Sequence, residues 1–325
     1  MAFSNTYNIT NPGSGVSNRE DLTDILTILA PEETPVLSMA NKSKATATFN
    51  EWTVDILATP SSTGIQEGAD ISTYTDKFAG RARLGNYVQL FRRDYMVSQL
   101  QQAVESVGPA RIAEAEAKAI REIKRDIEKT LCGDQDRSVE DGASARYASR
   151  GLGNWLSSTG PADVPSNFRT PAGSISGSGT TLTENVFNGI VASIFTQTGT
   201  VDALTLVAGT TLRRTVSGFA RSDNNSAENV YHVNQFATDK EITLSVNTYD
   251  SDFGIITVIN GNPVCLPDSS RGYLLNPNYI GVAELMSLGS TRVPNQGGGE
   301  RGYVDAALTL QVHSPLAHGK ITAVV

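Results

Sequence analysis

Histidine is the side chain best suited to acid–base or metal chemistry near neutral pH, and this chain has three. They are His232, His313 and His318, and none stands with a serine, cysteine or carboxylate in a recognisable catalytic signature. His313 and His318 lie five positions apart around a proline, a spacing that could hold a metal ion. We expect a structural or solvated role for both rather than a metal pair.

An acidic run could offer oxygen ligands to calcium. Asp134, Asp136, Ser138 and Glu140 alternate as they do at the start of a calcium-binding loop. The sixth position of that loop requires glycine and the twelfth requires glutamate, but this chain has Val139 and Ala145 there. The run therefore predicts a polar loop after a helix.

Two glycine-rich stretches could cradle phosphate groups. Residues 151–156 begin like a dinucleotide-binding fingerprint, but Leu156 replaces the third glycine and no strand precedes them. Residues 297–299 are three glycines without the Lys-Ser/Thr of a phosphate-binding loop. Both stretches are therefore predicted to be flexible connectors.

None of these four candidates has the residues that its chemistry requires. We therefore expect no catalytic residue, no cofactor site and no metal site, and we predict that the chain is not an enzyme.

Composition excludes further classes of function. The 325 residues carry a net charge of −8, and no segment is basic, which argues against tight binding of nucleic-acid phosphates. Cys132 and Cys265 fit neither a disulfide framework nor a paired metal motif, and a reducing compartment is expected. No stretch of about 18 apolar residues predicts a membrane span, and the N-terminus lacks the pattern of a signal peptide.

The first third of the chain predicts an arm and a long hairpin. Residues 1–18 indicate an extended arm that something outside its own composition must hold, and a capping box predicts a helix over 19–30. Apolar and polar residues alternate over 46–57 and again over 79–91, as in half-buried strands. The polar residues between them, 59–78, are too many for a turn. We expect a hairpin that reaches out to touch another molecule.

The clearest helix is expected over 109–131. Pro109 suits a helix start, Gly133 suits its end, and an apolar stripe runs between them. The stripe consists of Ile112, Ala119, Ile123, Ile127 and Leu131. Its other faces are charged, so one side is expected to be covered and the other to face water or another chain.

The second half predicts helices near one face of a sheet, which gives an α+β fold. Helices are expected over 186–194 and 210–219, and strands over 203–209, 241–249, 254–260 and 272–285. A final antiparallel pair is expected between 303–312 and 320–325, around the turn at 314–315. There is no internal repeat.

Four short blocks in this order resemble the major capsid proteins of tailed bacteriophages with the Hong Kong 97-type fold. The blocks are Thr34-Pro35-Val36 with Trp52 and Asp55; Gln66-Glu67-Gly68-Ala69-Asp70; Asn86-Tyr87-Val88-Gln89 with Val97, Ser98 and Gly108; and residues 122–128, EIKRDIE. They resemble the entry and tip of the family's extended loop, the approach to its spine helix, and the spine helix itself. The later half of the chain is similar only in the order of its elements.

The resemblance implies a division of the chain into the parts of a shell subunit. Residues 1–45 would be the N-arm and short helix, 46–91 the extended loop, and 92–182 the peripheral domain with its spine helix. Residues 183–265 would be the axial domain, and 266–325 would return to the peripheral domain. Contacts between subunits are expected at Trp52, Glu67, Lys77, Arg81, Arg83 and Gln89.

The resemblance also implies partners and a location. Copies of the chain would form hexamers and pentamers in an icosahedral or elongated shell around phage DNA. The shell would enclose this DNA without sequence-specific binding, and no membrane would take part. A portal is the other expected partner, together with scaffold or decoration proteins where they are used. We expect any scaffold to be a separate protein, because no charged helical segment stands before the arm in this sequence. The shell would assemble in the host bacterial cytoplasm and belong to the virion.

Three alternative functions stay open at this point. They are an encapsulin-like bacterial compartment shell, a surface adhesin and a hydrolase with an unrecognised site.

The resemblance also raises the question of covalent cross-links. Some relatives of the fold join a loop lysine to an asparagine of a neighbour through an isopeptide bond. Only Lys77 lies in the loop here, within a polar stretch, so it should stay charged at neutral pH. We expect a shell without covalent cross-links.

Overall fold

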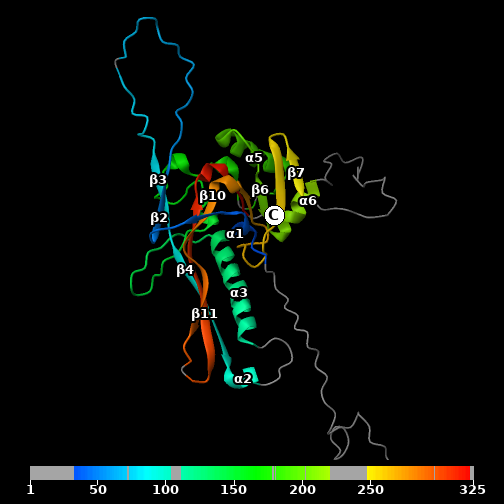
Figure 1. Ribbon diagram of the computed structural model, residues 1–325. Helices are drawn as coiled ribbons and strands as arrows, with labels where there is room; N and C mark the ends of the chain where they lie inside the picture. The colour runs from blue at the N-terminus through cyan, green and yellow to red at the C-terminus, as the bar shows by residue number, and fades with distance from the viewer. Residues whose placement is uncertain are drawn as a thin grey trace, which may run out of the picture.

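The fold was analysed in a computed structural model of the chain (Figure 1), which describes residues 33–71, 73–103, 111–177, 179, 181–201, 203–219, 247–295 and 297–322. The arm expected over 1–18 and the helix expected over 19–30 lie outside these residues. The described part is an elongated body with a loop that projects from one end.

The elements follow in chain order. The α-helices are α1 (Pro35–Met39), α2 (Gln99–Ala103), α3 (Ile112–Cys132), α4 (Leu152–Trp155), α5 (Glu184–Thr198) and α6 (Thr210–Phe219). The strands are β1 (Asn41–Lys44), β2 (Phe49–Val54), β3 (Ala82–Tyr87), β4 (Gln89–Ser98), β5 (Ile175–Ser176), β6 (Thr205–Ala208), β7 (Thr248–Ser251), β8 (Gly254–Asn260), β9 (Gly272–Leu275), β10 (Ile280–Val293), β11 (Gly299–Val312) and β12 (Gly319–Ile321). Short 3-10 turns are η1 (Ser166–Phe168), η2 (Ala172–Ser174), η3 (Pro277–Tyr279) and η4 (Pro315–Ala317).

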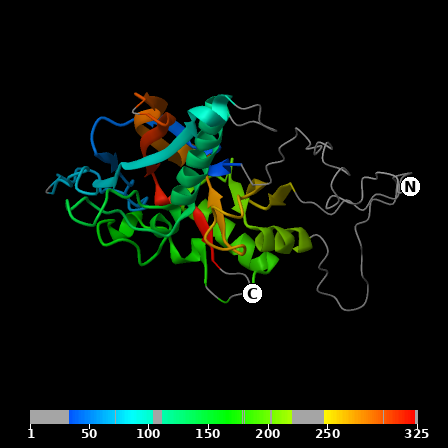
Figure 2. The ribbon, with the colours of Figure 1, turned by 90° about the horizontal axis from the view of Figure 1, so that it is seen from below.

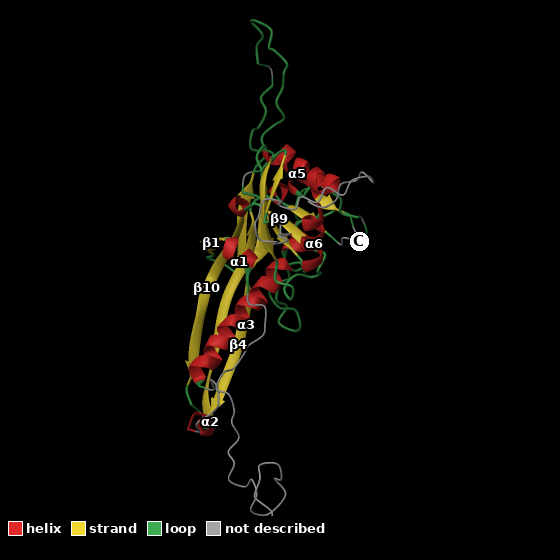
Figure 3. Ribbon diagram, turned by 90° about the vertical axis from the view of Figure 1, so that its right-hand side faces the viewer, coloured by secondary structure: helices red, strands yellow, loops and turns green. Residues whose placement is uncertain are grey.

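A four-stranded sheet carries the long helix. Its strand order is β1-β10-β11-β4, and α3 covers one of its faces (Figure 3). The expected apolar stripe is confirmed, since Ala119, Ile123, Ile127 and Leu131 are buried in one core with residues of β4, β10 and β11. In the view of Figure 2, α3 lies between the orange-red strands β10 and β11 and the yellow strands β7 and β8.

A six-stranded sheet and a two-stranded ribbon complete the fold. The six strands follow the order β5-β12-β9-β6-β8-β7, and α5 and α6 pack against them around a second core. The ribbon pairs β2 with β3 in antiparallel register from Phe49 opposite Tyr87 to Val54 opposite Ala82. The combination of helices and mixed sheets confirms the expected α+β class. None of the described helices is long and apolar enough to cross a bilayer.

The pairing expected for the last two strands is wrong. β11 lies between β10 and β4, and β4 pairs with it from Gly299 to Leu308. Closer to the turn, the backbone of Leu310 bonds to the side chains of Asn86 and Ser149 instead of to another strand. β12 pairs instead with β9 and β5 in the six-stranded sheet. Residues 266–325 therefore do not belong to a single sheet. β9 and β12 lie in the six-stranded sheet, while β10 and β11 lie in the four-stranded sheet.

Two strands expected as continuous are interrupted. Residues 272–285 divide into β9 and β10 at Pro277, which cannot donate a ladder hydrogen bond, and the Asn276 side chain accepts from the Asn278 N–H there. Residues 79–91 divide at Val88, whose N–H donates to Thr48 O at 2.8 Å. β3 belongs to the ribbon, and β4 continues into the four-stranded sheet.

A buried carboxylate on α3 holds the start of the described chain. Glu128 is fully buried, and its two oxygens accept from the backbone N–H groups of Val36 and Leu37, each at 2.9 Å. Burial raises the pKa of Glu128, and the two hydrogen bonds oppose that shift. The charged face expected for the helix therefore includes one residue that faces the core.

Replacement of this carboxylate by an amide tests its role. Glu128→Gln keeps one acceptor but turns an NH2 group toward a buried N–H, so we expect the free energy of unfolding to fall by about 2 kcal/mol. Glu122→Gln, on the exposed ion pair with Lys118 at 3.9 Å, should change it by less than about 0.5 kcal/mol. Denaturant unfolding of both variants measures the difference. Equal stabilities would show that the two N–H groups do not depend on Glu128.

Candidate assembly surfaces

The loop between β2 and β3 stands away from the body (Figure 1). This protruding loop, residues 55–81, has no strand among its described residues and exposes apolar side chains along its length. Leu57 is 95% exposed, Ile65 88% and Tyr74 85%. Apolar side chains at this exposure gain nothing from the subunit's own core, which is typical of a surface that another chain covers.

Four of the six residues expected at subunit contacts lie on the loop or its base. Glu67 and Lys77 are exposed on the protruding loop. Arg81 pairs with Asp55 at 2.9 Å where the loop begins and ends, and Arg83 approaches Glu51 at 3.6 Å across the ribbon. All four are available to a neighbouring molecule, and their role there stays a prediction.

The other two turn toward their own subunit. The ring centroid of Trp52 lies 5.7 Å from that of Trp155 and 5.9 Å from that of His313. The Gln89 side-chain oxygen accepts from the Ser149 N–H at 3.0 Å. Both residues anchor the base of the loop to the body. An intersubunit role for them is likewise untested.

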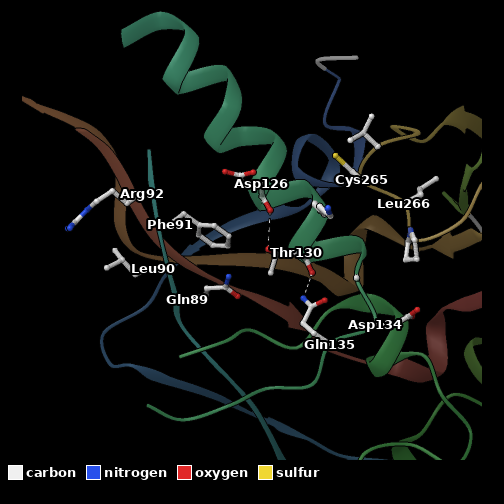
Figure 4. Close-up of a pocket in the computed structure, with 14 residues that line it drawn as sticks. Gln89, Leu90, Phe91, Arg92, Asp126, Thr130, Asp134, Gln135, Cys265 and Leu266 are labelled. Atoms are coloured by element: carbon white, nitrogen blue, oxygen red, sulfur yellow. Dashed lines mark hydrogen bonds between the residues drawn. The ribbon is translucent and has the colours of Figure 1, made fainter. Parts of the chain in front are cut away.

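A groove of about 750 Å³ lies beside β4 (Figure 4). Its walls come from β4, the C-terminal half of α3 and the connection after β8. The lining residues are Gln89, Leu90, Phe91, Arg92, Asp126, Lys129, Thr130, Gly133, Asp134, Gln135, Val264, Cys265, Leu266 and Pro267. This groove could not be predicted from the sequence, because no local pattern brings residues 264–267 beside α3.

The groove has a mixed polar and apolar lining, and ion pairs hold its two carboxylates. Arg93 makes a two-pronged ion pair with Asp126, at 2.6 and 2.8 Å, and this hydrogen bonding raises the pKa of Arg93. Asp134 pairs with Arg271 at 2.7 Å. Burial raises the pKa of the Cys265 thiol to about 11, so it stays protonated at neutral pH and is a poor nucleophile. The groove offers surface for contact and no activated group.

The face of the four-stranded sheet opposite α3 is open over part of its length. Leu90 and Met286 flank Ala307 in one row of this face, and both are exposed. Met96 is exposed further along β4. Between them Arg92 lies over the Tyr303 ring at 4.7 Å and approaches Asp305 at 3.7 Å. Apolar and charged rows therefore alternate on this sheet face.

The residues singled out for chemistry are spread over the structure. His313 is half-buried against Trp52, and His318 is fully buried, with its Nδ1 accepting from the Asn276 N–H at 3.1 Å. Cys132 and Cys265 are both buried and unbonded to each other. Within the described ranges, no three histidine, cysteine or carboxylate side chains gather as a metal site would require. His232 lies outside those ranges.

Comparison with known proteins was made on sequence and on structure. A family model described as SU10 major capsid protein matches residues 3–325. No curated protein sequence matches the chain. A cyanophage A-1(L) capsid structure is 16% identical with a TM-score of 0.65, and the match covers 96% of this chain and 98% of that one. A capsid chain of a native GTA particle is 12% identical with a TM-score of 0.64, covering 98% and 99%. A Mycobacterium phage Bobi structure is 10% identical with a TM-score of 0.60, covering 95% and 97%.

Proposed function

The chain belongs to the SU10 major capsid protein family, and from that premise we propose that its copies assemble as hexamers and pentamers into a closed shell around phage DNA. It is a structural protein of the phage head and not an enzyme. The family assignment favours this function over a compartment shell, an adhesin or a hydrolase. The resemblance noted in the capsid-like sequence blocks is thereby confirmed.

The protruding loop is the observation that carries the proposal for assembly. Its exposed Leu57, Ile65 and Tyr74 belong to none of the core clusters that the described residues form. Burial of one such side chain contributes about 1.5–3 kcal/mol, so a few of them per contact are enough to favour association. Many weak contacts of this kind, repeated around a closed shell, act together.

The groove beside β4 is a fitting receptor for the loop of a neighbour. The loop is acidic, with Glu67, Asp70 and Asp76 among its exposed residues. Lys129 lines the groove, while the two carboxylates in the groove wall, Asp126 and Asp134, are already paired with Arg93 and Arg271. Opposite charges would align a loop there and exclude wrong registers.

The domain division and the other partners belong to this proposal as well. The two larger of the three hydrophobic clusters support a peripheral part built on the four-stranded sheet and an axial part built on the six-stranded sheet, with the last segment shared between them. A net charge of −8 suits an inner wall that must not bind packaged DNA by its phosphates. A portal and separate scaffold or decoration proteins, and assembly in the host cytoplasm before incorporation in the virion, complete it.

Shell formation is tested on the purified full chain. We expect size-exclusion chromatography with light scattering, over a series of concentrations and salt conditions, to give species far heavier than 34.6 kDa. Negative-stain microscopy of those species should show closed shells. A monodisperse monomer at every concentration, salt and pH would overturn the proposal.

A second expectation concerns covalent linkage. Lys77 is exposed, and its flanking residues Asp76 and Phe78 are exposed too, so the described residues do not enclose its amine in an apolar pocket. Particles boiled in denaturing detergent should release one band near 34.6 kDa. A ladder of multiples that disappears in Lys77→Ala would contradict this expectation.

A further inference from the structure

A fully buried asparagine lies where the protruding loop joins the body. Asn86, near the end of β3, is 0% exposed. Its Nδ2 lies 2.9 Å from Leu310 O, 3.0 Å from Ser149 Oγ and 3.2 Å from Arg150 O. Its Oδ1 accepts from the Arg150 N–H at 2.8 Å and from the Tyr87 N–H at 3.0 Å. One side chain therefore connects β3 to β11 and to the segment before α4.

These contacts continue to the end of the long helix. Ser149 O accepts from Gln135 Nε2 at 3.2 Å, and the same nitrogen reaches Thr130 O in the last turn of α3. Ser149 Oγ also accepts from the Leu310 N–H at 3.3 Å. The base of the loop, the C-terminal end of α3 and the strand β11 thus share one connected set of hydrogen bonds, which is buried around Asn86 and partly buried at Gln135.

Arg137 holds the ribbon from its other side. Its guanidinium donates to Gly85 O and lies 5.0 Å from the Phe49 ring centroid. Asp163 accepts it at 3.2 Å and also binds the fully buried Arg150 at 2.7 Å. A Cβ at Gly85 would lie 2.6 Å from a Phe49 ring carbon, so the ribbon fits closely at this point.

Beyond the ribbon, few contacts among the described residues fix the direction of the loop. The last described polar link across it is the ion pair of Arg81 with Asp55. Each arm of the loop is roughly 13 residues long, which at ~3.3 Å per residue reaches about 40 Å. A tilt of about 10° at the base would therefore move the tip by about 7 Å. The direction of the loop depends on its base.

We propose that Asn86, assisted by Arg137, is a positioning residue that fixes the angle at which the protruding loop leaves the subunit. Asparagine suits the place because it offers a donor and an acceptor from one buried group, which neither alanine nor aspartate does. The angle then decides where the loop meets a neighbour. This consequence rests on the proposed role of the loop in assembly.

The angle is measurable in unassembled subunits. Spin labels at Ser62→Cys on the loop and Lys124→Cys on α3 report the distance between them, since both positions are exposed and the native cysteines are buried. We expect Asn86→Ala to shift and broaden the distance distribution by several ångströms. Asn262→Ala is the matched control, because Asn262 is also buried and binds Glu33 O and the Val264 N–H away from the loop.

The outcomes separate the positioning role from a general loosening. An unchanged distribution in Asn86→Ala, or an equal change in Asn262→Ala, would overturn the proposal. If Asn86→Ala does not fold, Arg137→Ala decides: a smaller shift in the same sense supports the proposal, and no shift overturns it. A changed angle with shells of unchanged size and yield would leave Asn86 as a positioning residue and count against the loop's role in assembly.

Discussion

Deletion of residues 61–74 is expected to leave a subunit that melts cooperatively and no longer closes shells. The deleted residues lie beyond the ribbon, and none of those described belongs to a core cluster. The ribbon keeps its register and its links through Asn86, Trp52 and Arg137. Stability should therefore change little while shell yield falls to background. Calorimetry measures the first, and light scattering with negative-stain microscopy measures the second.

A loop of the same length with different side chains is the matched control. Replacement of 61–74 by a Gly/Ser segment preserves reach but removes Ile65, Ile71 and Tyr74, which are exposed in the subunit. Shells restored by this segment would mean that length alone is required and that apolar contacts are not. Unfolding of the deletion variant would instead place the tip in a folding core, contrary to the structure's arrangement.

The elements that follow from local pattern could be predicted from the sequence. The apolar stripe of α3 and its end near Gly133 depend on neighbours within a few turns, and the predicted helix over 109–131 corresponds to Ile112–Cys132. The alternation that predicted the hairpin also needs no distant information. The prediction for β12 was wrong because a strand's partner depends on which strand edges are already occupied. β4 occupies most of the edge of β11 that would have received β12, and β12 pairs with β9 instead.

The buried polar residues could not be found from the sequence for a related reason. Glu128 stands among charged residues of an exposed-looking helix, and its partners Val36 and Leu37 are 92 and 91 positions away. Asn86 lies in an alternating strand and binds Leu310 across 224 positions. The residues next to a charged or amide side chain in the sequence do not show whether it is buried. Its hydrogen-bond partners can be identified only from the folded structure.

Mild acid is expected to destabilise the subunit through His318. This imidazole is fully buried, and burial, with a smaller effect of nearby His313, lowers its pKa to about 4. The unfolded chain takes up a proton near pH 6.5 while the folded chain does not, so the unfolded state binds more protons between these values. The contribution of neutral His318 to the free energy of unfolding is fully present above about pH 6.5, and about 3 kcal/mol of it is lost as the pH approaches 4.

His318→Gln separates this effect from the titration of carboxylates. Glutamine is neutral throughout and can still accept from the Asn276 N–H, so the loss of unfolding free energy between pH 7 and pH 5, about 2 kcal/mol, should largely disappear. Asp163 does not explain a loss of stability between pH 7 and pH 5. Burial alone would raise the pKa of Asp163, but Arg150 lowers it, so the stability that this carboxylate contributes is lost only below about pH 4. Glu128 has a raised pKa and acts in the opposite sense, favouring the folded state as the pH falls. Burial also lowers the pKa of the half-buried His313, which therefore acts in the same sense as His318, and His313→Gln measures its share. Denaturant unfolding of unassembled wild type, His318→Gln and His313→Gln at both pH values measures the difference. An acid loss that persists undiminished in His318→Gln would assign it to another group.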